Sequence, residues 1–158
     1  VAKTNKAYEF LTKQIKDKTA IRRYKAIVEG VVEKDSGEIK TFFGRDKKHK
    51  EKMAVWENEG KEAITLYKVI ERFKNYTFVE YELKTGRTHQ IRVHSKYINH
   101  PIVNDSLYGA KKFKVKTTEQ VLQAYSLCFM NLKNEIIEIK IDEDEDLQKV
   151  LRYLRSKK

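Results

Sequence analysis

Alternating apolar and polar side chains predict a series of β-strands along this chain. Between Arg22 and Val28, Tyr24, Ala26 and Val28 would share one strand face. A turn signal at Asp35-Ser36-Gly37 then predicts a short hairpin. The alternation recurs at 63–70, 76–83, 122–129 and 135–141, with a turn at 74–75 joining the first two segments.

Two other segments carry apolar residues at helical spacing. Residues 4–18 predict a helix with Thr4 as its N-cap, and the expected buried stripe is Ala7, Tyr8, Leu11 and Ile15. Five consecutive acids at 142–146 precede a second stripe, which is Leu147, Val150, Leu151 and Leu154. Acids at its start and bases at its end match the helix dipole, so the acidic run predicts a helix start rather than a metal site.

These elements predict the α+β class, with a mixed, largely antiparallel sheet flanked by helices. The helices and strands are interspersed without regular βαβ units, and the sequence contains no internal repeat. A length of 158 residues suits one domain with a real core, so we expect a single domain over 1–158.

The stretch from Gly86 to His94 concentrates polar chemistry at the predicted end of a strand. Gly86 can form the turn that leaves the strand, and Thr88 stands at the predicted N-cap of a following helix. Arg87, His89, Gln90 and Arg92 fall within six positions. Free N–H groups at a helix start favour anions, and neighbouring arginines favour phosphate further.

The formal net charge is +11, which favours a polyanionic partner, although a solvated basic surface would also account for it. The dense cationic run at 45–52 fits either an ordinary loop or RNA contact. Residues 111–116 interleave lysines with apolar residues and fit either a protected strand edge or a groove wall that follows phosphates. The sequence contains no membrane-length apolar run and no signal-peptide pattern. The single Cys128 cannot form an internal disulfide, so we expect an inert core thiol in a cytoplasmic protein.

Metal and cofactor chemistry have little support in the sequence. His89 and His94 are five positions apart and would lie on different helix faces, without a Cys or carboxylate pair at ligand spacing. Phosphate-binding glycine motifs are absent. Glu80 and Glu82 share one predicted strand face beside many cations, so we expect salt bridges there. From spacing alone, Tyr24 is best interpreted as a core aromatic residue.

Five segments, in order, resemble the motifs of the RluA-type RNA pseudouridine synthases. Residues 86–94, GRTHQIRVH, are similar to that family's signature. Residues 22–30 resemble its (R/K)xYxAxVxG strand, and residues 60–69 resemble its GKxAxTxYxV segment. Residues 100–109 resemble HPIxGDxxYG, with Asn104 for the usual Gly, and residues 122–129 resemble LHAxxLxF, with Gln123 for the usual His.

The family's RLDxxTSG motif, which carries the nucleophilic aspartate, is not found in this chain. Val1-Ala2-Lys3-Thr4 resembles the end of the strand that follows that motif. The aspartates outside the acidic run do not fit the motif; they are Asp17, Asp35, Asp46 and Asp105. We therefore expect a partial catalytic domain that is inactive alone, and we expect Arg92 to find a substitute anion, a nearby carboxylate or water.

The resemblance implies isomerisation of uridine to pseudouridine in structured RNA, ribosomal RNA before transfer RNA, without metal or cofactor. Tyr24 would stack on the everted uracil and act as a general base, Arg92 would pair with the nucleophile, and Leu122 would line the base pocket. The implied RNA-binding residues are Arg22, Arg87, His89, Gln90, Lys111 and Lys112.

Two other functions compete with this interpretation. A non-catalytic basic RNA-binding module could share the fold. A DNA-binding protein would need a helix rich in base-reading side chains, and the sequence offers no such helix. We also expect self-association if sheet edges or apolar surface are exposed.

Overall fold

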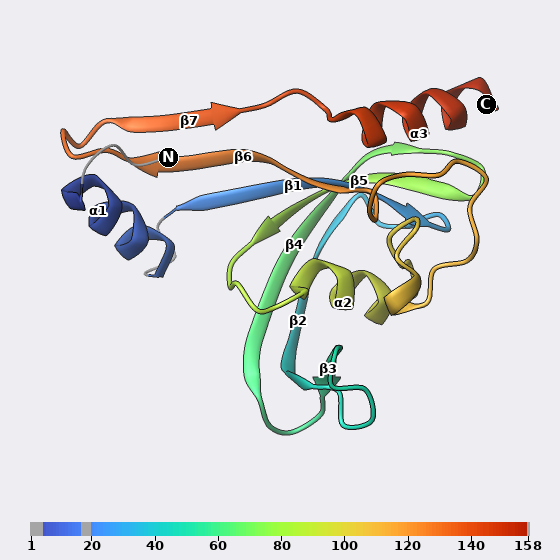
Figure 1. The fold of residues 1–158 in the computed structure, drawn as a ribbon, viewed down its shortest axis with the longest axis horizontal. Helices are drawn as coiled ribbons and strands as arrows, with labels where there is room; N and C mark the ends of the chain where they lie inside the picture. The colour runs from blue at the N-terminus through green and yellow to red at the C-terminus, as the bar shows by residue number, and fades with distance from the viewer. Residues whose placement is uncertain (1–4, 17–19, 158) are drawn as a thin grey trace.

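In the described part of the chain, a seven-stranded antiparallel sheet organises the fold (Figure 1). The computed structural model describes residues 5–16 and 20–157. The strand order is β3-β2-β4-β5-β1-β6-β7. The strands are β1 Ile21–Glu29, β2 Ser36–Arg45, β3 Met53–Trp56, β4 Lys61–Arg72, β5 Tyr76–Leu83, β6 Leu122–Met130 and β7 Ile136–Lys140. The helices are α1 Asn5–Lys16, α2 Gln90–Tyr97, the short 3₁₀ helix η1 Ser106–Tyr108 and α3 Glu145–Ser156.

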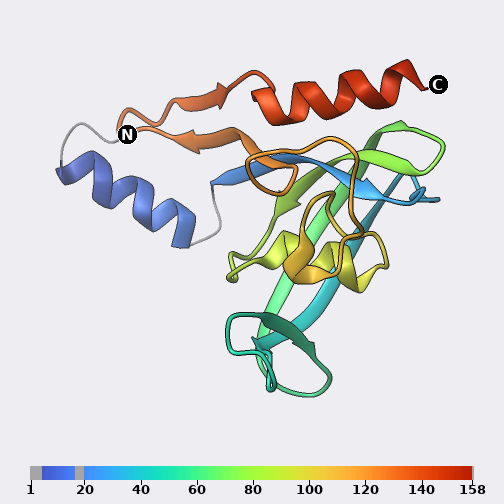
Figure 2. The ribbon, with the colours of Figure 1, turned by 45° about the vertical axis from the view of Figure 1, so that its right-hand side comes forward.

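The side chains of β1 alternate between the two faces of the sheet and contribute to a separate hydrophobic core on each face. Ala26 and Val28 pack with Ile91 of α2, and Tyr24 packs against the same cluster from its edge. Ile27 points to the other face, where it packs with the apolar stripe of α3. Figure 2 shows α2 and α3 on opposite sides of the sheet. The α+β class and the faces predicted for β1 are therefore confirmed.

Helix α3 follows the sequence prediction closely. The Asp144 carboxylate accepts a hydrogen bond from the Leu147 N–H, so one of the consecutive acids is the N-cap. The predicted stripe is buried: Leu147, Val150, Leu151 and Leu154. The acidic run therefore begins a helix, as expected.

Helix α1 is held against the end of β6 by the Gln14 side chain. Its amide donates to the Met130 carbonyl at 2.5 Å and accepts from the Met130 N–H at 2.6 Å. The predicted cap Thr4 lies outside the described residues, and so does the burial of the predicted stripe of Ala7, Tyr8, Leu11 and Ile15.

Two local predictions are wrong, and one of two open alternatives is excluded. The turn signal at Asp35-Ser36-Gly37 does not close a hairpin: β2 begins at Ser36 and pairs with β3 and β4, whereas β1 pairs with β5 and β6. Residues 111–116 form no strand, which excludes the strand-edge alternative and leaves the groove wall as a prediction; Phe113 and Val115 pack against the α3 core. Cys128 on β6 is half-buried rather than fully in the core.

The strands β2 and β4 extend away from the main body and carry β3 at their far end (Figure 1). We call residues 42–60, which comprise the end of β2, the loop 46–52, β3 and the turn into β4, the finger. The predicted cationic loop is therefore the connection between β2 and β3. Among the described residues, β3 and β7 are the edge strands of the sheet.

Candidate active site

Helix α2 begins differently from its prediction. Thr88 is not the N-cap: His89 takes that position in a left-handed conformation, φ 56°, and makes no side-chain capping bond. Gln90 supplies the missing closure, because its Oε1 accepts from the Arg87 N–H at 2.9 Å and from the Thr85 hydroxyl at 2.7 Å. The side-chain amide of Gln90 therefore stabilises the turn that precedes α2.

Gln90 cannot contact RNA, contrary to the sequence expectation. Its side chain is 2% exposed, and its Nε2 donates to the Ile64 carbonyl and to the Thr65 hydroxyl, both at 2.9 Å. With these bonds and those to the turn, the amide is fully committed within the protein. We therefore assign Gln90 to holding α2 on β4.

His94 is a second buried polar residue beneath the helix. Its two ring nitrogens contact the hydroxyls of Thr41, at 2.9 Å, and Thr65, at 2.7 Å. Its ring also packs edge-to-face on Phe43, with 5.1 Å between centroids. Burial lowers the pKa of His94 to about 4, so the imidazole is neutral near pH 7.

Arg92 is paired with Asp105 in a two-point contact. Its Nε donates to Oδ2 at 2.9 Å and its Nη2 to Oδ1 at 2.8 Å. The Asp105 side chain is 1% exposed and the Arg92 side chain 15%. This hydrogen-bonded pairing raises the pKa of Arg92 further above its ordinary value. The expectation that Arg92 finds a nearby carboxylate is confirmed.

Tyr108 joins this pair to the finger. The Arg92 guanidinium lies 5.0 Å from the centre of the Tyr108 ring, and the Tyr108 hydroxyl accepts from the Met53 N–H at 3.0 Å. The same hydroxyl contacts Nδ1 of His89 at 2.7 Å. Burial and the neighbouring Arg92 charge lower the pKa of His89. Sequence reasoning assigned no role to Asp105 or Tyr108, although both stand in the HPIVNDSLYG loop that it singled out.

Tyr24 and Leu122 lie side by side on the sheet face that α2 covers. Leu122 is opposite Ala26 in the β1–β6 pairing, and Tyr24 is opposite Tyr81 in the β1–β5 pairing. Both half-buried side chains pack against the cluster that contains Ile91, the residue before Arg92. The residues expected to be catalytic therefore come from three elements that meet on one face.

Arg22 lies on the same face of β1 as Tyr24 and reaches beneath Gly86. A Cβ built on Gly86 would stand 2.8 Å from Nη1 of Arg22. The Nε of Arg22 is one of two buried side-chain polar atoms in the described part of the chain that have no hydrogen-bond partner; the other is Oγ of Ser126. This guanidinium is not committed to an ion pair within the described residues.

The other residues expected to bind RNA lie at the surface. The Nε of Arg87 donates to the Glu62 carbonyl at 2.8 Å, which fixes the side chain along β4. Lys111 and Lys112 are exposed, and the Lys111 N–H donates to Glu29 on β1. Their positions leave the predicted RNA contacts open to test.

On the opposite sheet face the acids of β5 form the salt bridges that the sequence predicted. Nε of Arg23 lies 3.2 Å from Glu82 and 3.9 Å from Glu80. Over residues 5–16 and 20–157, no group of three or more His, Cys, Asp or Glu residues is placed to hold a metal ion. In the same ranges, no helix has the length and apolar character needed to cross a bilayer.

Comparison with known proteins gives a consistent result. Residues 1–97 match the family model described as RNA pseudouridylate synthase. An uncharacterized RNA pseudouridine synthase of Bacillus subtilis, YlyB, is 42% identical over 98% of this chain and 51% of its own length. The ribosomal large subunit pseudouridine synthase D of Neisseria meningitidis is 37% identical over 98% of this chain and 44% of its own. The chain thus spans about half the length of these curated relatives.

A solved structure shares the fold. Human RNA pseudouridylate synthase domain containing 4 superimposes with a TM-score of 0.80, over 96% of this chain and 69% of the other, at 18% sequence identity. At that identity the likeness concerns the arrangement of the sheet and helices.

Proposed function

Because the chain belongs to the RNA pseudouridylate synthase family, we propose that the protein converts uridine to pseudouridine in structured RNA. The N1–C1′ glycosidic bond breaks, the uracil turns, and a C5–C1′ bond forms; C5 then loses its proton and N1 takes up a proton, so the product is an isomer of the substrate. A uridine within a helix must leave the stack before its glycosidic bond can be reached, and an aromatic side chain offsets the cost of unstacking.

The observation that carries this proposal is the grouping of Tyr24, Leu122 and α2 on one sheet face. Tyr24 stacks on the everted base and accepts the C5 proton, and Leu122 lines the base pocket beside it. Arg22 is two residues before Tyr24 on the same face of β1, and its Nε has no hydrogen-bond partner. In this proposal the RNA backbone is bound by Arg22, Arg87, His89, Lys111 and Lys112.

Arg92 holds the nucleophilic carboxylate in this proposal. A guanidinium has five N–H donors, and the pair with Asp105 uses two of them. The remaining donors can bind a second carboxylate beside the ribose. Asp105 itself is unsuited to attack, because its side chain is 1% exposed and both of its oxygens are bound to Arg92. We propose that the 158-residue chain is inactive by itself for want of the RLDxxTSG aspartate.

Ribosomal RNA is the substrate we favour, supported by the name of the Neisseria relative. The charge of +11 suits any polyanion and does not separate ribosomal from transfer RNA. We place the protein in the cytoplasm, where a single unpaired cysteine remains reduced.

Tritium release from RNA labelled at uridine C5 tests the activity. A chain that also carries the RLDxxTSG motif should release tritium from ribosomal RNA, and Tyr24→Phe should slow release by about 10²–10⁴-fold. Tyr97→Phe is the matched control, because Tyr97 is a 54% exposed phenol on α2. RNA binding without any release by the longer chain would favour the non-catalytic RNA-binding module instead.

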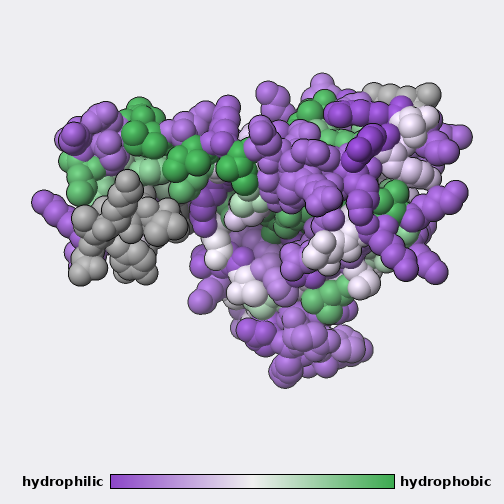
Figure 3. All heavy atoms as spheres, turned by 45° about the horizontal axis from the view of Figure 1, so that its top comes forward, coloured by the Kyte–Doolittle hydropathy of each residue, from purple (hydrophilic) through white to green (hydrophobic). Residues whose placement is uncertain are grey.

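We also propose that the chain self-associates along β7. This edge strand exposes Ile136 by 74% and Ile139 by 48%. Hydrophobic side chains gather on the left arm of the molecule, where the β6–β7 hairpin lies (Figure 3). Open strand edges with apolar side chains favour pairing with another chain. Sedimentation should show oligomers that Ile136→Lys abolishes; a monomer at all concentrations would refute this proposal.

A further inference from the structure

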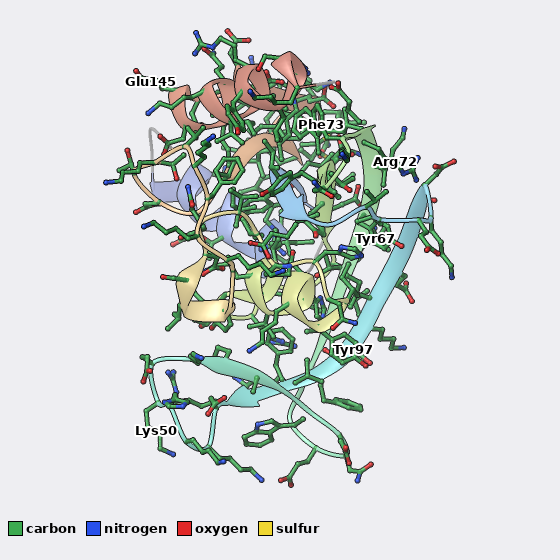
Figure 4. The ribbon with its side chains drawn as sticks, turned by 90° about the vertical axis from the view of Figure 1, so that its right-hand side faces the viewer. Lys50, Tyr67, Arg72, Phe73, Tyr97 and Glu145 are labelled. Atoms are coloured by element: carbon green, nitrogen blue, oxygen red, sulfur yellow. The ribbon has the colours of Figure 1, made fainter. Side chains whose placement is uncertain are left out.

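The finger carries a surface that the proposed catalytic site does not use. Met53 and Val55 of β3 pack toward Tyr108 and the α2 side. Because side chains alternate along a strand, Trp56 lies on the outer face of the finger. Figure 4 shows the finger below α2, with Lys50 near its tip.

Trp56 lies flat against the neighbouring strand. A Cβ built on Gly44 would fall 2.0 Å from Cε2 of the indole, so only glycine at this position allows the ring to approach the β2 backbone. The Nζ of Lys47 lies 5.3 Å from the ring centre. The half-buried indole is therefore supported by backbone on one side, and the exposed Lys47 side chain lies near its ring.

The loop beside Trp56 is ordered and basic. One carboxylate oxygen of Asp46 accepts from the N–H groups of Lys48 at 2.9 Å and His49 at 2.8 Å, and the Arg45 guanidinium donates to the Lys50 carbonyl at 2.8 Å. Within the described residues, none of the loop lysines forms an ion pair; they are Lys47, Lys48, Lys50 and Lys52. Their charges are available to a partner.

Trp56 lines an open hollow of about 600 Å³ whose lining combines cations with carboxylate and amide groups. The cations are Lys47 and Lys48, and the oxygen-bearing side chains are Asp46, Glu57, Asn58 and Glu59. Cations suit a phosphate, whereas carboxylate and amide oxygens accept from the amino and imino groups of a nucleobase. The indole ring in the same lining suits the flat face of a base.

We propose that this hollow binds an unpaired nucleotide of the RNA substrate, with its base stacked on Trp56, its phosphate against Lys47 and Lys48, and its base edge toward Glu57 and Glu59. This inference rests on the proposed function for the identity of the RNA. Because Trp56 faces away from Tyr108, the nucleotide bound here is a different one from the target uridine. Lys47 leaves the indole face to meet the phosphate.

An acidic peptide is the competing partner for the lysines, but two observations favour RNA. Glu57 and Glu59 repel a peptide carboxylate and a phosphate alike, but a base also brings amino and imino groups that donate hydrogen bonds to them. A flat aromatic surface stacks on any base, whereas acidic side chains offer it no comparable partner. Guanine, with neighbouring N1–H and N2 amino donors, fits the acidic side chains better than uracil does.

The sequence supplies its own reporter, since Trp56 is the sole tryptophan in the chain. We expect a single-stranded RNA decamer to quench Trp56 fluorescence on binding, and an abasic decamer of the same charge to bind without quenching. A guanine-containing decamer should bind more tightly than a uracil-only one. Binding of RNA without any quenching would overturn the stacking, and equal affinity for the two decamers would overturn the proposed base orientation.

Variants are compared by the anisotropy of labelled RNA. Trp56→Ala should weaken binding by about tenfold, or ~1.4 kcal/mol, while Trp56→Phe should retain most of the affinity. Lys133→Ala, on the β6–β7 turn, is the control for a lost surface charge. Unchanged affinity in Trp56→Ala, tighter binding of an acidic peptide than of RNA, or quenching by free guanosine monophosphate at the affinity of the decamer would each refute the proposal.

These measurements use binding and fluorescence of the 158-residue chain, so they do not depend on catalysis. If the chain that carries RLDxxTSG forms no pseudouridine but RNA still quenches Trp56, the catalytic proposal fails and the stacking site stands. If pseudouridine forms and Trp56 emission is unaffected by RNA, the reverse holds.

Discussion

The layer beneath α2 and the strand β7 invert the usual distribution of side chains. Beneath α2, Gln90 and His94 are 2% and 0% exposed, although both are polar. On β7, Ile136 is 74% exposed, although it is among the most apolar residues. Gln90 and His94 both have hydrogen-bond partners. In contrast, the described residues leave Ile136 of β7 largely uncovered.

This difference shows that the two regions are stabilised in different ways. Beneath α2, hydrogen bonds to Thr65, Thr85 and the β4 backbone fix the position of the helix, so polarity there defines geometry. On β7, apolar side chains contribute little to this fold and are free to bury surface in association. Four predictions test the contrast.

The largest effect should come from Arg92→Ala. This substitution leaves the buried Asp105 carboxylate without its partner, and we expect the free energy of unfolding to fall by about 3–5 kcal/mol in urea denaturation. Lys140→Ala is the control on β7, where the exposed pair with Glu138 should contribute under ~1 kcal/mol. Equal losses in the two variants would contradict the contrast.

The same substitution in both regions gives the second test. Ile102 is 0% exposed and packs with the β1 core, so Ile102→Ala should cost about 2–5 kcal/mol. Ile136→Ala should change the stability of the monomer by under ~0.5 kcal/mol. Urea denaturation at low protein concentration separates these values, and a comparable loss in Ile136→Ala would show that β7 is packed.

Gln90→Ala should follow, with a loss of about 2–3 kcal/mol. The variant removes the partners of buried groups at Thr65, Thr85 and the Arg87 N–H, and unsatisfied buried groups are costly. Gln148→Ala on α3 is the matched control, because its single amide hydrogen bond is exposed. Hydrogen exchange at the start of α2 should rise in Gln90→Ala only.

The smallest effect is the pH dependence due to His94. Its pKa of about 4 in the folded state lies below the ordinary 6.5, so the unfolded state binds more protons between these values. Stability should therefore fall as the pH drops from 7 to 5, by about 2 kcal/mol from this residue. His94→Gln should flatten the curve by that amount, and an unchanged slope would contradict the prediction.

The sequence predicted those elements whose signals are local. The stripe and acidic start of α3 lie within a few residues of one another, and the β4–β5 hairpin is joined by a short turn. The start of α2 was misplaced because Thr88 has the composition of a cap, while the actual closure uses Gln90 and partners on β4. Only the folded chain brings those groups together.

The same distinction between local and long-range signals applies to the candidate site. Motif resemblance identified Tyr24, Arg92 and Leu122, and the structure brings their elements to one face. The pairing of Arg92 with Asp105 depends on the path of the loop after α2, which no periodicity encodes. The Trp56 surface depends on Gly44 in a neighbouring strand, so it too became visible only in three dimensions.

The insertion of β1 between β5 and β6 has a consequence during synthesis. Its first neighbour, β5, begins at Tyr76, 47 positions after Glu29. At translation rates of about 5–20 residues per second, β1 emerges from the ribosome roughly 2–10 s before either flanking strand exists. During that interval the nascent chain presents a bare strand to the cell, and chaperones that bind extended apolar segments have time to engage it.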